Sequence, residues 1–394
     1  MQKKQVAIID VGSSKITAII GERGINKTFV IKVEQTFDYE GFESGSFFDV
    51  DGLKNALVSA ADTIKTYLKS KIGTVYVGVP GSFTKVIVNN SQISFPKKRK
   101  IQEADVDALF DAAFVMSSTK YTLINRSAIV YELDDARRVA NPIGITSEIL
   151  KGKLSFVLCS NYFIEAVKTT LENAGIENVE CVSSALAEAL YLIEAEKRDR
   201  IAVLVDVGYI STTFNIIQGD GIIYQDSFDF GGGYITAALM QELDLSFDEA
   251  EKIKNVANLA QISESSYDVV EGENGKYYSL EIVKKVIKTA LDGLCESLAN
   301  AIENSGYILP EYVSVMITGG GISYIRGAKE HVSGRLDTAV EVVAPSVPLM
   351  DKPDKASVLS LLDLALDQIK IDNIRFKERK YVRSINFWTR YVKG

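Results

Sequence analysis

The stretch that decides the fold is Val6-Ala-Ile-Ile-Asp10-Val-Gly12-Ser-Ser-Lys15, and Ala202-Val-Leu-Val-Asp206-Val-Gly208-Tyr-Ile-Ser-Thr-Thr213 repeats its design further along the chain. Each is an apolar run that ends in Asp-Val-Gly and leads to small hydroxyl residues. The apolar runs predict buried strands, and glycine lets the backbone turn sharply where each strand leaves its sheet. Because such a turn presents backbone N–H groups to an anion, each loop is a candidate phosphate cradle. The repetition predicts two similar lobes that face one ligand.

The composition is that of a globular protein with room for two or more domains. The chain has 394 residues, 46% of them hydrophobic and 24% charged, and a net charge of −8, which argues against a general nucleic-acid binder. Three cysteines without CxxC spacing are typical of reduced thiols, and a single histidine excludes a His-rich metal site. A strand is predicted close to the N-terminus and no apolar run reaches about 18 residues, so we expect neither a signal peptide nor a spanning helix.

The order of apolar runs and turn residues predicts two core lobes, each with an accessory part. Pro96-Lys-Lys-Arg-Lys100 is expected to form an exposed basic turn. The expected parts are a first-lobe core (1–82, 161–200 and 326–370), an inserted α+β subdomain (83–160), a second-lobe core (201–230 and 306–325), a smaller helical or mixed subdomain (231–305), a spacer (371–378) and an amphipathic helix (379–394).

Several segments of the sequence are suited to bind a nucleotide together. The carboxylates of Asp10 and Asp206 would hold a hydrated Mg²⁺ against phosphates, and the helix that follows Gly231–Gly233 favours anions at its N-terminus. Glu251 and Lys254 lie one turn apart on a predicted helix, where they would either reach ribose hydroxyls or face solvent. The candidate nucleotide-binding residues are Asp10, Gly12, Ser13, Ser14, Lys15, Asp206, Gly208, Ser211, Thr212, Gly232, Gly233, Glu251, Lys254, Gly319, Gly320 and Gly321.

The order of these motifs resembles the actin-like ATPase superfamily and, within it, most closely the bacterial cell-division family FtsA. The resemblance covers nearly the whole chain. It implies an α/β chain with a two-lobed actin-like (ribonuclease-H-like) ATPase fold, an α+β subdomain inserted in the first lobe, ATP or ADP with Mg²⁺ at the hinge, and assembly into protofilaments with copies of itself. The motifs that carry it are Asp10–Lys15, Gly45–Asp49, Val77–Ser82, Glu103–Asp107, Asn141–Gly144, Ala185–Ala189, Phe230–Thr236, Glu249–Lys254 and Ile317–Gly321.

The second loop departs from the pattern of the family, which has the form Asp-Ile-Gly-Gly-Gly-Thr-Thr-Asp. Tyr209 and Ile210 stand where two glycines are expected, and Thr213 replaces an acid. The β-branched Ile210 is expected to resist positive φ and to add bulk beside the phosphates. We therefore expect nucleotide binding with weak or absent turnover, at most a weak ATPase, and assign no catalytic residue.

The end of the chain is basic and aromatic, in contrast to the acidic remainder. Such a composition with helical spacing is typical of an interfacial helix on anionic lipid, and FtsA proteins also end in an amphipathic membrane-targeting helix. A helix that docks on the acidic surface of the same chain and a disordered tail are the alternatives. The candidate membrane-contacting residues are Tyr381, Arg383, Ile385, Phe387, Trp388, Arg390, Tyr391, Val392 and Lys393.

The resemblance further implies a scaffold on the cytoplasmic face of the bacterial inner membrane at the division site. It would anchor the C-terminal tail of the tubulin-like protein FtsZ, or an analogous filament protein, with Lys284, Lys285 and Lys288 as weak candidate contacts. Three alternatives remain: a PilM-like component of a pilus or secretion machine, a small-molecule kinase of the same superfamily, and a divergent FtsA paralogue with another partner.

Overall fold

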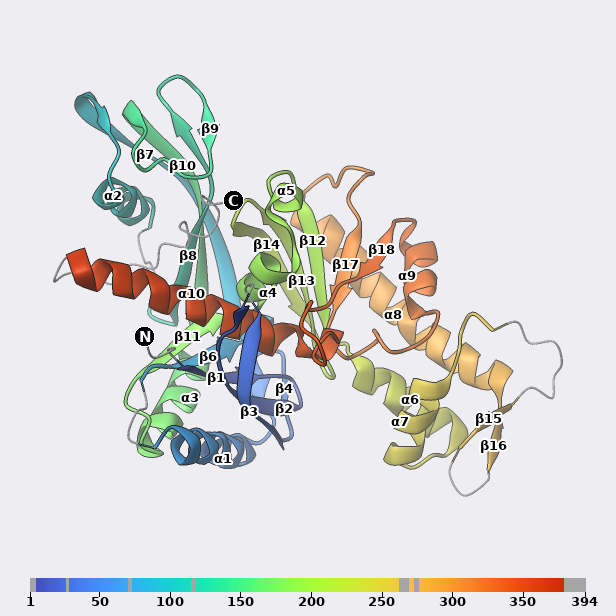
Figure 1. Cartoon of the computed structure of the whole chain (residues 1–394). Helices are drawn as coiled ribbons and strands as arrows, with labels where there is room; N and C mark the ends of the chain where they lie inside the picture. Colours follow the sequence, from blue (N-terminus) through green and yellow to red (C-terminus); the bar gives the residue numbers. More distant parts are fainter. Residues whose placement is uncertain are drawn as a thin grey trace.

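The computed structural model describes residues 5–25, 28–69, 73–114, 118–261, 269–272 and 276–378. They form two lobes, each built on a five-stranded sheet, and a separate four-stranded sheet that extends from the first lobe. In Figure 1 this four-stranded sheet lies at the upper left and the yellow helices of the second lobe lie at the lower right. The accessory parts therefore occupy opposite ends of the molecule, and the two larger sheets lie between them.

The sheet of the first lobe has the order β11-β6-β1-β2-β3. The central strand β1 pairs antiparallel with β2 on one side and parallel with β6 on the other, and β11 continues the parallel half. Apolar residues fill β1 and β6, as expected for strands that are covered on both faces. The strands are β1 (Gln5–Val11), β2 (Lys15–Arg23), β3 (Phe29–Asp38), β6 (Val75–Val79) and β11 (Val179–Ser183).

Helices cover both faces of this sheet. One helix, α1 (Val50–Leu68), packs against β2 and β3 beside α3 (Asn161–Asn173), and α10 (Ala356–Glu378) packs against β1, β2 and β6 beside α4 (Ser184–Leu192). The helix α1 forms because its apolar residues recur at helical spacing, and the Asp49 side chain caps its first turn by accepting from the backbone N–H of Asp51.

The second lobe repeats this topology, with the sheet order β14-β13-β12-β17-β18. The prediction that residues 326–370 belong to the first lobe is wrong in its first part, because β18 pairs in parallel with β17 of the second-lobe sheet. The elements are β12 (Ala202–Val207), β13 (Thr212–Gln218), β14 (Gly221–Phe228), β17 (Val315–Thr318), β18 (Val340–Val342), α5 (Ala195–Arg198), α8 (Leu280–Ser305) and α9 (Ala328–Leu336), with α6 (Gly232–Leu243), α7 (Phe247–Val256), β15 (Val269–Glu271) and β16 (Tyr277–Ser279) in the smaller subdomain.

The insertion is a four-stranded sheet, in the order β7-β10-β8-β9, with one helix packed on it. Its core is separate from the cores of the two lobes and contains Leu109, Phe110, Tyr131 and Phe156. The elements are β7 (Thr84–Lys100), α2 (Glu103–Ala113), β8 (Tyr121–Leu133), β9 (Arg138–Val139) and β10 (Thr146–Ser160).

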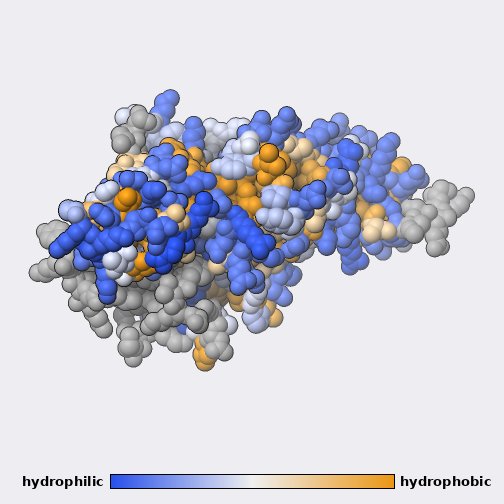
Figure 2. All heavy atoms as spheres, turned by 90° about the horizontal axis from the view of Figure 1, so that it is seen from above, coloured by the Kyte–Doolittle hydropathy of each residue, from blue (hydrophilic) through white to orange (hydrophobic). Residues whose placement is uncertain are grey.

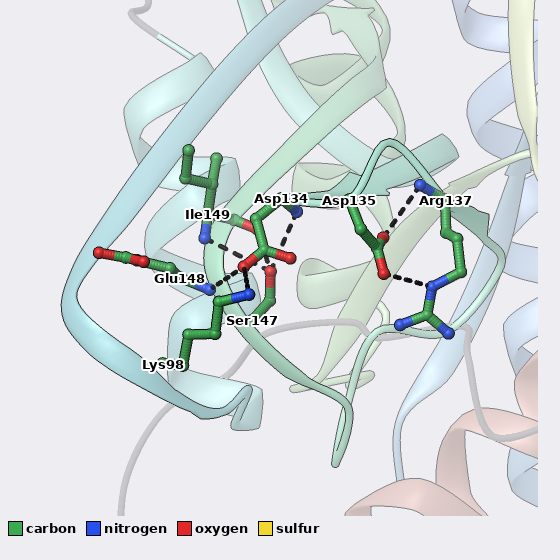
Figure 3. A network of polar contacts seen from close by, with 7 residues as sticks. All are labelled: Lys98, Asp134, Asp135, Arg137, Ser147, Glu148 and Ile149. Carbon is green, nitrogen blue, oxygen red and sulfur yellow. Dashed lines mark hydrogen bonds and ion pairs between the residues drawn. The ribbon is translucent and has the colours of Figure 1, made fainter.

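The segment 96–100 is the end of β7, so the prediction of a basic turn there is wrong. The pairing of β7 with β10 skips between Ser94 and Arg99, which places Pro96 where the ladder needs no N–H donor. Figure 3 shows how Asp134 stabilises this irregularity: its carboxylate pairs with Lys98 Nζ at 2.9 Å and accepts from the backbone N–H of Glu148 at 3.2 Å.

The last helix, α10, is longer than the sequence predicted. It continues to Glu378, so the segment 371–378 that was predicted as a spacer is part of a helix. The candidate membrane helix at 379–394 lies outside the described residues. Among the described helices, none combines the length and the apolar composition that crossing a membrane requires. Figure 2 shows polar residues over most of one face of the molecule, with hydrophobic residues in patches between them.

Candidate functional site

The two Asp-Val-Gly stretches form hairpins with the same backbone geometry. In the first, the N–H of Gly12 donates to the carbonyl of Lys15 at 2.9 Å, and in the second the N–H of Gly208 donates to the carbonyl of Ser211 at 2.9 Å. A Cβ atom on Gly12 would lie 3.0 Å from the Lys15 oxygen, and one on Gly208 2.9 Å from the Ser211 oxygen. Both turns are therefore tight enough to favour glycine, which explains the repeated Asp-Val-Gly pattern.

The two hairpins face one cavity of about 300 Å³ between the lobes. A volume of this size is at the lower end for small-molecule sites. The predicted residues that the structure brings together on its wall are Asp10, Gly12, Ser13, Ser14, Lys15, Asp206, Gly208, Ser211, Gly319 and Gly320.

Three carboxyl groups from both lobes meet at the base of this cavity. Burial raises the pKa of Asp10 to about 6, although a hydrogen bond from Ser357 and the charge of Lys15 lower it. Burial and repulsion from Asp10 raise the pKa of Asp206 to about 7. Burial, followed by repulsion from Asp206 and Asp10, raises the pKa of Glu188 well above its usual range. The site therefore concentrates negative charge that a cation would stabilise.

Glu188 was not among the predicted site residues. Its side chain is 1% exposed, and neither carboxylate oxygen has a hydrogen-bond donor within the described part of the chain. The signal was present, since Glu188 is the one charged residue in the otherwise apolar or small helix α4. Burying an acid without a hydrogen-bond partner costs free energy, so such a residue indicates a role in binding a ligand or a metal or in carrying a proton.

A wall formed by the end of the chain was also missed. The helical turn η3 (Pro353–Lys355) and the start of α10 line the cavity, and the Ser357 hydroxyl donates to Asp10 Oδ1 at 2.9 Å. Tyr324 donates its hydroxyl to Asp354 on the same wall. These residues are distant in sequence from either hairpin, and no local motif marks them.

The N-terminus of α6 is not available for phosphate in the way the sequence predicted. The N–H of Gly232 donates to the carbonyl of Gly208 at 3.0 Å, and the N–H of Gly233 donates to that of Tyr209 at 2.7 Å. The glycines are instead needed because backbones pack closely, with the N–H of Gly321 bonded to Val207 O at 2.8 Å. Gly232, Gly233 and Gly321 thus shape the second hairpin from behind and do not line the cavity.

Thr212 is a structural residue as well. Its side chain is fully buried, and its hydroxyl donates to the carbonyl of Phe230 at 2.6 Å. That hydrogen bond holds the segment before α6 against β13.

Glu251 and Lys254 do not line the cavity, and only Glu251 is partly exposed to solvent. Lys254 is 4% exposed, and its Nζ atom donates to Glu251 Oε1 at 2.6 Å and to Thr236 Oγ1 at 2.8 Å. Tyr209 lies over this pair, with its hydroxyl 3.2 Å from Glu251 Oε1 and its ring centroid 5.4 Å from Lys254 Nζ. Tyr209 thus separates the predicted ribose contacts from the cavity that it lines.

The expected backbone strain at Ile210 does not occur. Neither Tyr209 nor Ile210 is among the residues with positive φ, so the hairpin accepts both without that penalty. Ile210 instead contacts the first lobe. Its backbone N–H donates to Ser13 Oγ at 3.0 Å, and its side-chain Cδ1 atom lies against Gly41.

A second set of contacts closes the rim of the cleft. The short strands β4 (Phe42–Glu43) and β5 (Ser46–Phe47) enclose a turn whose Ser44 N–H donates to Asp229 Oδ1 at 2.9 Å. The Ser44 hydroxyl donates to the other oxygen of the same carboxylate. The lobes therefore meet both at the hairpins and at the rim.

The donor set fits a hydrated cation better than a directly held metal. In the described ranges no group of three His, Cys, Asp or Glu side chains is arranged to hold a metal ion. Asp10 and Asp206 both face the cavity and both have raised pKa values, so a divalent cation bound there through water would favour their ionised forms.

The predicted partner contacts lie on a surface hollow along α8. Lys284, Lys285 and Lys288 line it together with Glu281 and Asp292, so its charge is mixed. No contact in the structure tests a partner there, and it stays a prediction.

Known proteins share this fold over nearly the whole chain. FtsA of Bacillus subtilis (strain 168) is 23% identical over 374 residues, which cover 92% of this chain and 84% of that protein. FtsA of Neisseria meningitidis serogroup B is 20% identical over 87% of this chain and 84% of that protein. The solved PilM-PilN type IV pilus biogenesis complex matches with a TM-score of 0.59 and 16% identity over 92% of this chain and 99% of that chain. MreB5 of Spiroplasma citri bound to ADP matches with a TM-score of 0.54 and 14% identity over 94% of this chain and 98% of that chain.

These likenesses show an actin-like ATPase fold, as the sequence predicted. A family model described as type IV pilus assembly protein PilM matches residues 157–362, which is just over half of the chain. The chain therefore belongs to the PilM family, and FtsA proteins are among its relatives.

Proposed function

We propose that this protein binds Mg²⁺ and a nucleotide between its lobes and acts as a nucleotide-regulated scaffold with slow or absent turnover. The observation that carries the proposal is the meeting of Asp10, Glu188 and Asp206 from two lobes at one cavity beside a glycine hairpin. Their raised pKa values indicate that the site is incomplete without positive charge. Mg²⁺ bound to a polyphosphate supplies that charge.

The residues of the first hairpin suit the phosphate end of such a ligand. The hydroxyl of Ser14 and the backbone of the turn face the cavity, and Lys15 adds an exposed cation beside Asp10. Ser357 orients Asp10 by donating to one carboxylate oxygen. Burial, and then the charges of Asp206 and Asp10, raise the pKa of Glu188, which places this residue to take or release a proton at the base of the site. The second hairpin is filled by Tyr209 and Ile210, which supports slow turnover.

Calorimetric titration of the full chain with Mg-ATP tests the binding proposal. We expect binding in the wild type and its loss in Asp10→Ala, because the carboxylate that faces the phosphates is removed. Asp62→Ala, which changes an exposed acid on α1, serves as the control and should bind normally. Absence of wild-type binding at about millimolar ATP, a weak-affinity limit, would sink the proposal. A phosphotransfer assay over sugars and carboxylates tests the kinase alternative, and we expect no transfer.

We further propose that the scaffold assembles on the cytoplasmic face of the inner membrane, with residues 379–394 as its anchor. The basic and aromatic composition of that segment supports this role. Because α10 is described as far as Glu378, truncation after Glu378 keeps the whole described part of that helix. We expect the full chain to sediment with anionic liposomes and the truncated chain to remain in solution. Equal sedimentation of both would contradict the anchor.

The partner is proposed to be a filament protein of the division site, such as FtsZ, as the FtsA relatives suggest. A second candidate is supported equally: the PilM family match and the likeness to the PilM-PilN complex favour a role in pilus or secretion assembly. Co-sedimentation with FtsZ filaments and direct titration with PilN distinguish the two. Electron microscopy on lipid monolayers with ATP tests assembly itself, with double filaments expected.

A further inference from the structure

Tyr209 makes an unusual set of contacts for a residue in a hairpin turn. Its hydroxyl donates to Glu251 Oε1, and its ring lies over the ammonium group of Lys254. Burial, and then the charge of Glu251, raise the pKa of Tyr209 to about 12, so the phenol keeps its proton and remains a donor. A flat ring over a cation and a hydroxyl on a carboxylate are the contacts that a nucleoside would make with the same pair.

The ring is also fixed by its surroundings. A Cβ atom on Gly233 would lie 2.8 Å from Tyr209 Cε1, so a larger residue at the start of α6 would collide with the ring. Phe247, the first residue of α7, meets the ring edge at a centroid distance of 6.4 Å. The backbone carbonyl of Tyr209 accepts from the Gly233 N–H at 2.7 Å. Tyr209 therefore fills a formed recess between α6 and α7.

We infer that Tyr209 is a specificity-determining residue that occupies the nucleoside part of the site. This inference rests on the proposed function, because it assumes that phosphates bind beside Asp10. With Tyr209 in place, the cavity offers contacts to a polyphosphate, while the tyrosine lies between that cavity and the pair Glu251 and Lys254. A nucleoside gains those contacts only when the tyrosine leaves the recess, so part of its binding energy is spent on displacement.

Exchange of Tyr209 for serine tests this directly, because serine is the residue at the equivalent position of the first hairpin. Mg-ATP and Mg-tripolyphosphate are titrated separately into the full chain by calorimetry. We expect wild type to bind the two ligands with affinities within about threefold. In Tyr209→Ser, the affinity for Mg-ATP should rise about tenfold or more while that for tripolyphosphate stays nearly constant.

Two further variants identify the cause. Tyr209→Phe keeps the ring and loses the hydroxyl, so its gain should be smaller than that of the serine variant. Tyr312→Ser, which removes an exposed tyrosine elsewhere in the second lobe, is the matched control and should leave both affinities unchanged. Thermal unfolding confirms that each variant is folded. If Tyr209→Ser is folded and its ratio of ATP to tripolyphosphate affinity equals that of wild type, the inference is wrong.

A double-mutant cycle protects the test against an indirect effect of loosening the hairpin. Glu251→Gln should lower the affinity for ATP more in the Tyr209→Ser background than in the wild-type background, where the tyrosine hydroxyl already donates to Glu251. Additive effects would overturn the inference. The tripolyphosphate titration separates the two failures. Absence of tripolyphosphate binding to the wild type would refute the proposed function and the inference with it, whereas Asp10-dependent tripolyphosphate binding with an unchanged affinity ratio in Tyr209→Ser would refute the inference alone.

Discussion

The two hairpins are built alike and used differently. Each begins with a buried strand, an aspartate and a glycine, and each is closed by the same hydrogen bond from the glycine N–H to the carbonyl three residues later. In the first hairpin the two central residues are Ser13 and Ser14, which leave room in the cavity. In the second they are Tyr209 and Ile210, and both side chains are engaged with other elements.

This difference shows that backbone geometry and ligand space are set by different residues. The glycine and the sheet register fix the conformation of the turn, so both hairpins keep the same closing hydrogen bond although their central residues differ. The central residues decide how much space each turn leaves. Ser13 and Ser14 are small and line the cavity, whereas Tyr209 contacts α7 and Ile210 contacts the first lobe. A loop can therefore keep a phosphate-binding pattern in sequence and still serve as a contact within the protein.

The largest expected effect comes from removing the aspartate of each hairpin in turn. Asp10→Asn should weaken Mg-nucleotide binding by about 100-fold and Asp206→Asn by about tenfold, because only the first hairpin keeps small residues and Lys15 around its carboxylate. Calorimetric titration measures both. Equal losses would break the asymmetry and restore a symmetric phosphate clamp.

The same two variants carry an independent check. Each removes a group whose ionised form is disfavoured by burial, so each ligand-free variant should melt higher than wild type at pH 8, by about 2 °C or more. Asp62→Asn on the exposed face of α1 provides the control, with no comparable rise. A fall in the melting temperature of both variants would show that the carboxylates stabilise the closed lobes.

The next largest effect concerns the glycines that support the second hairpin. Gly319 has a φ of +84°, and a Cβ atom there would lie 2.3 Å from Asp206 Oδ1, whereas at Gly320 the nearest atom is Asp354 Cβ at 3.2 Å. Gly319→Ala should therefore lower the free energy of unfolding by about 3 kcal/mol and Gly320→Ala by less than about 1 kcal/mol. Urea denaturation measures both, and similar values would mean that the backbone can relax around residue 319.

Much of this arrangement followed from sequence patterns that act locally. The apolar runs and the paired Asp-Val-Gly stretches predicted two lobes, and the order of apolar runs and turn residues predicted the insertion at 83–160. The position of β18 could not be predicted, since three residues of strand carry little periodicity and only their pairing with β17 assigns them to a lobe. Pro96 was predicted to lie in a turn. The irregular pairing that accommodates it within a strand involves β7 and β10 together, so the segment alone does not reveal it.

The site divided in the same way. The hairpin residues were found because glycine and aspartate have local reasons to recur at strand ends. Glu251 and Lys254 were placed on one helix face correctly, but their burial beneath Tyr209 depends on a hairpin far away in the chain. Glu188 was overlooked because its role comes from two other carboxylates that only the closed fold brings near.

The pH dependence of binding sharpens the comparison further. With pKa values raised to about 6 for Asp10 and about 7 for Asp206, each carboxyl holds a proton to a higher pH when folded than when unfolded. The contribution of these groups to the stability of the ligand-free protein should therefore be complete below the ordinary value of 3.8 and be lost as pH rises through the folded-state values. Mg-nucleotide affinity should move the other way and increase about tenfold from pH 6 to pH 8, because the cation needs the ionised forms. Asp206→Asn should shift the midpoint of that increase downward, and an unchanged midpoint would assign the titration to another group.

The smallest expected effect lies at the rim, where the turn between β4 and β5 contacts Asp229 of the second lobe. Asp229→Ala removes both hydrogen bonds from Ser44 and should destabilise the contact between the lobes at the rim by about 1 kcal/mol. Ser44→Ala keeps the backbone donor and should destabilise that contact less. Hydrogen exchange at residues 41–47 measures the opening. The contact between Ile210 and Ser13 at the base of the cleft remains in both variants, so faster exchange should stay confined to the rim. Exchange that also increases at both hairpins would mean that rim and base open as one unit, and that the second hairpin holds the lobes together only while the rim is closed.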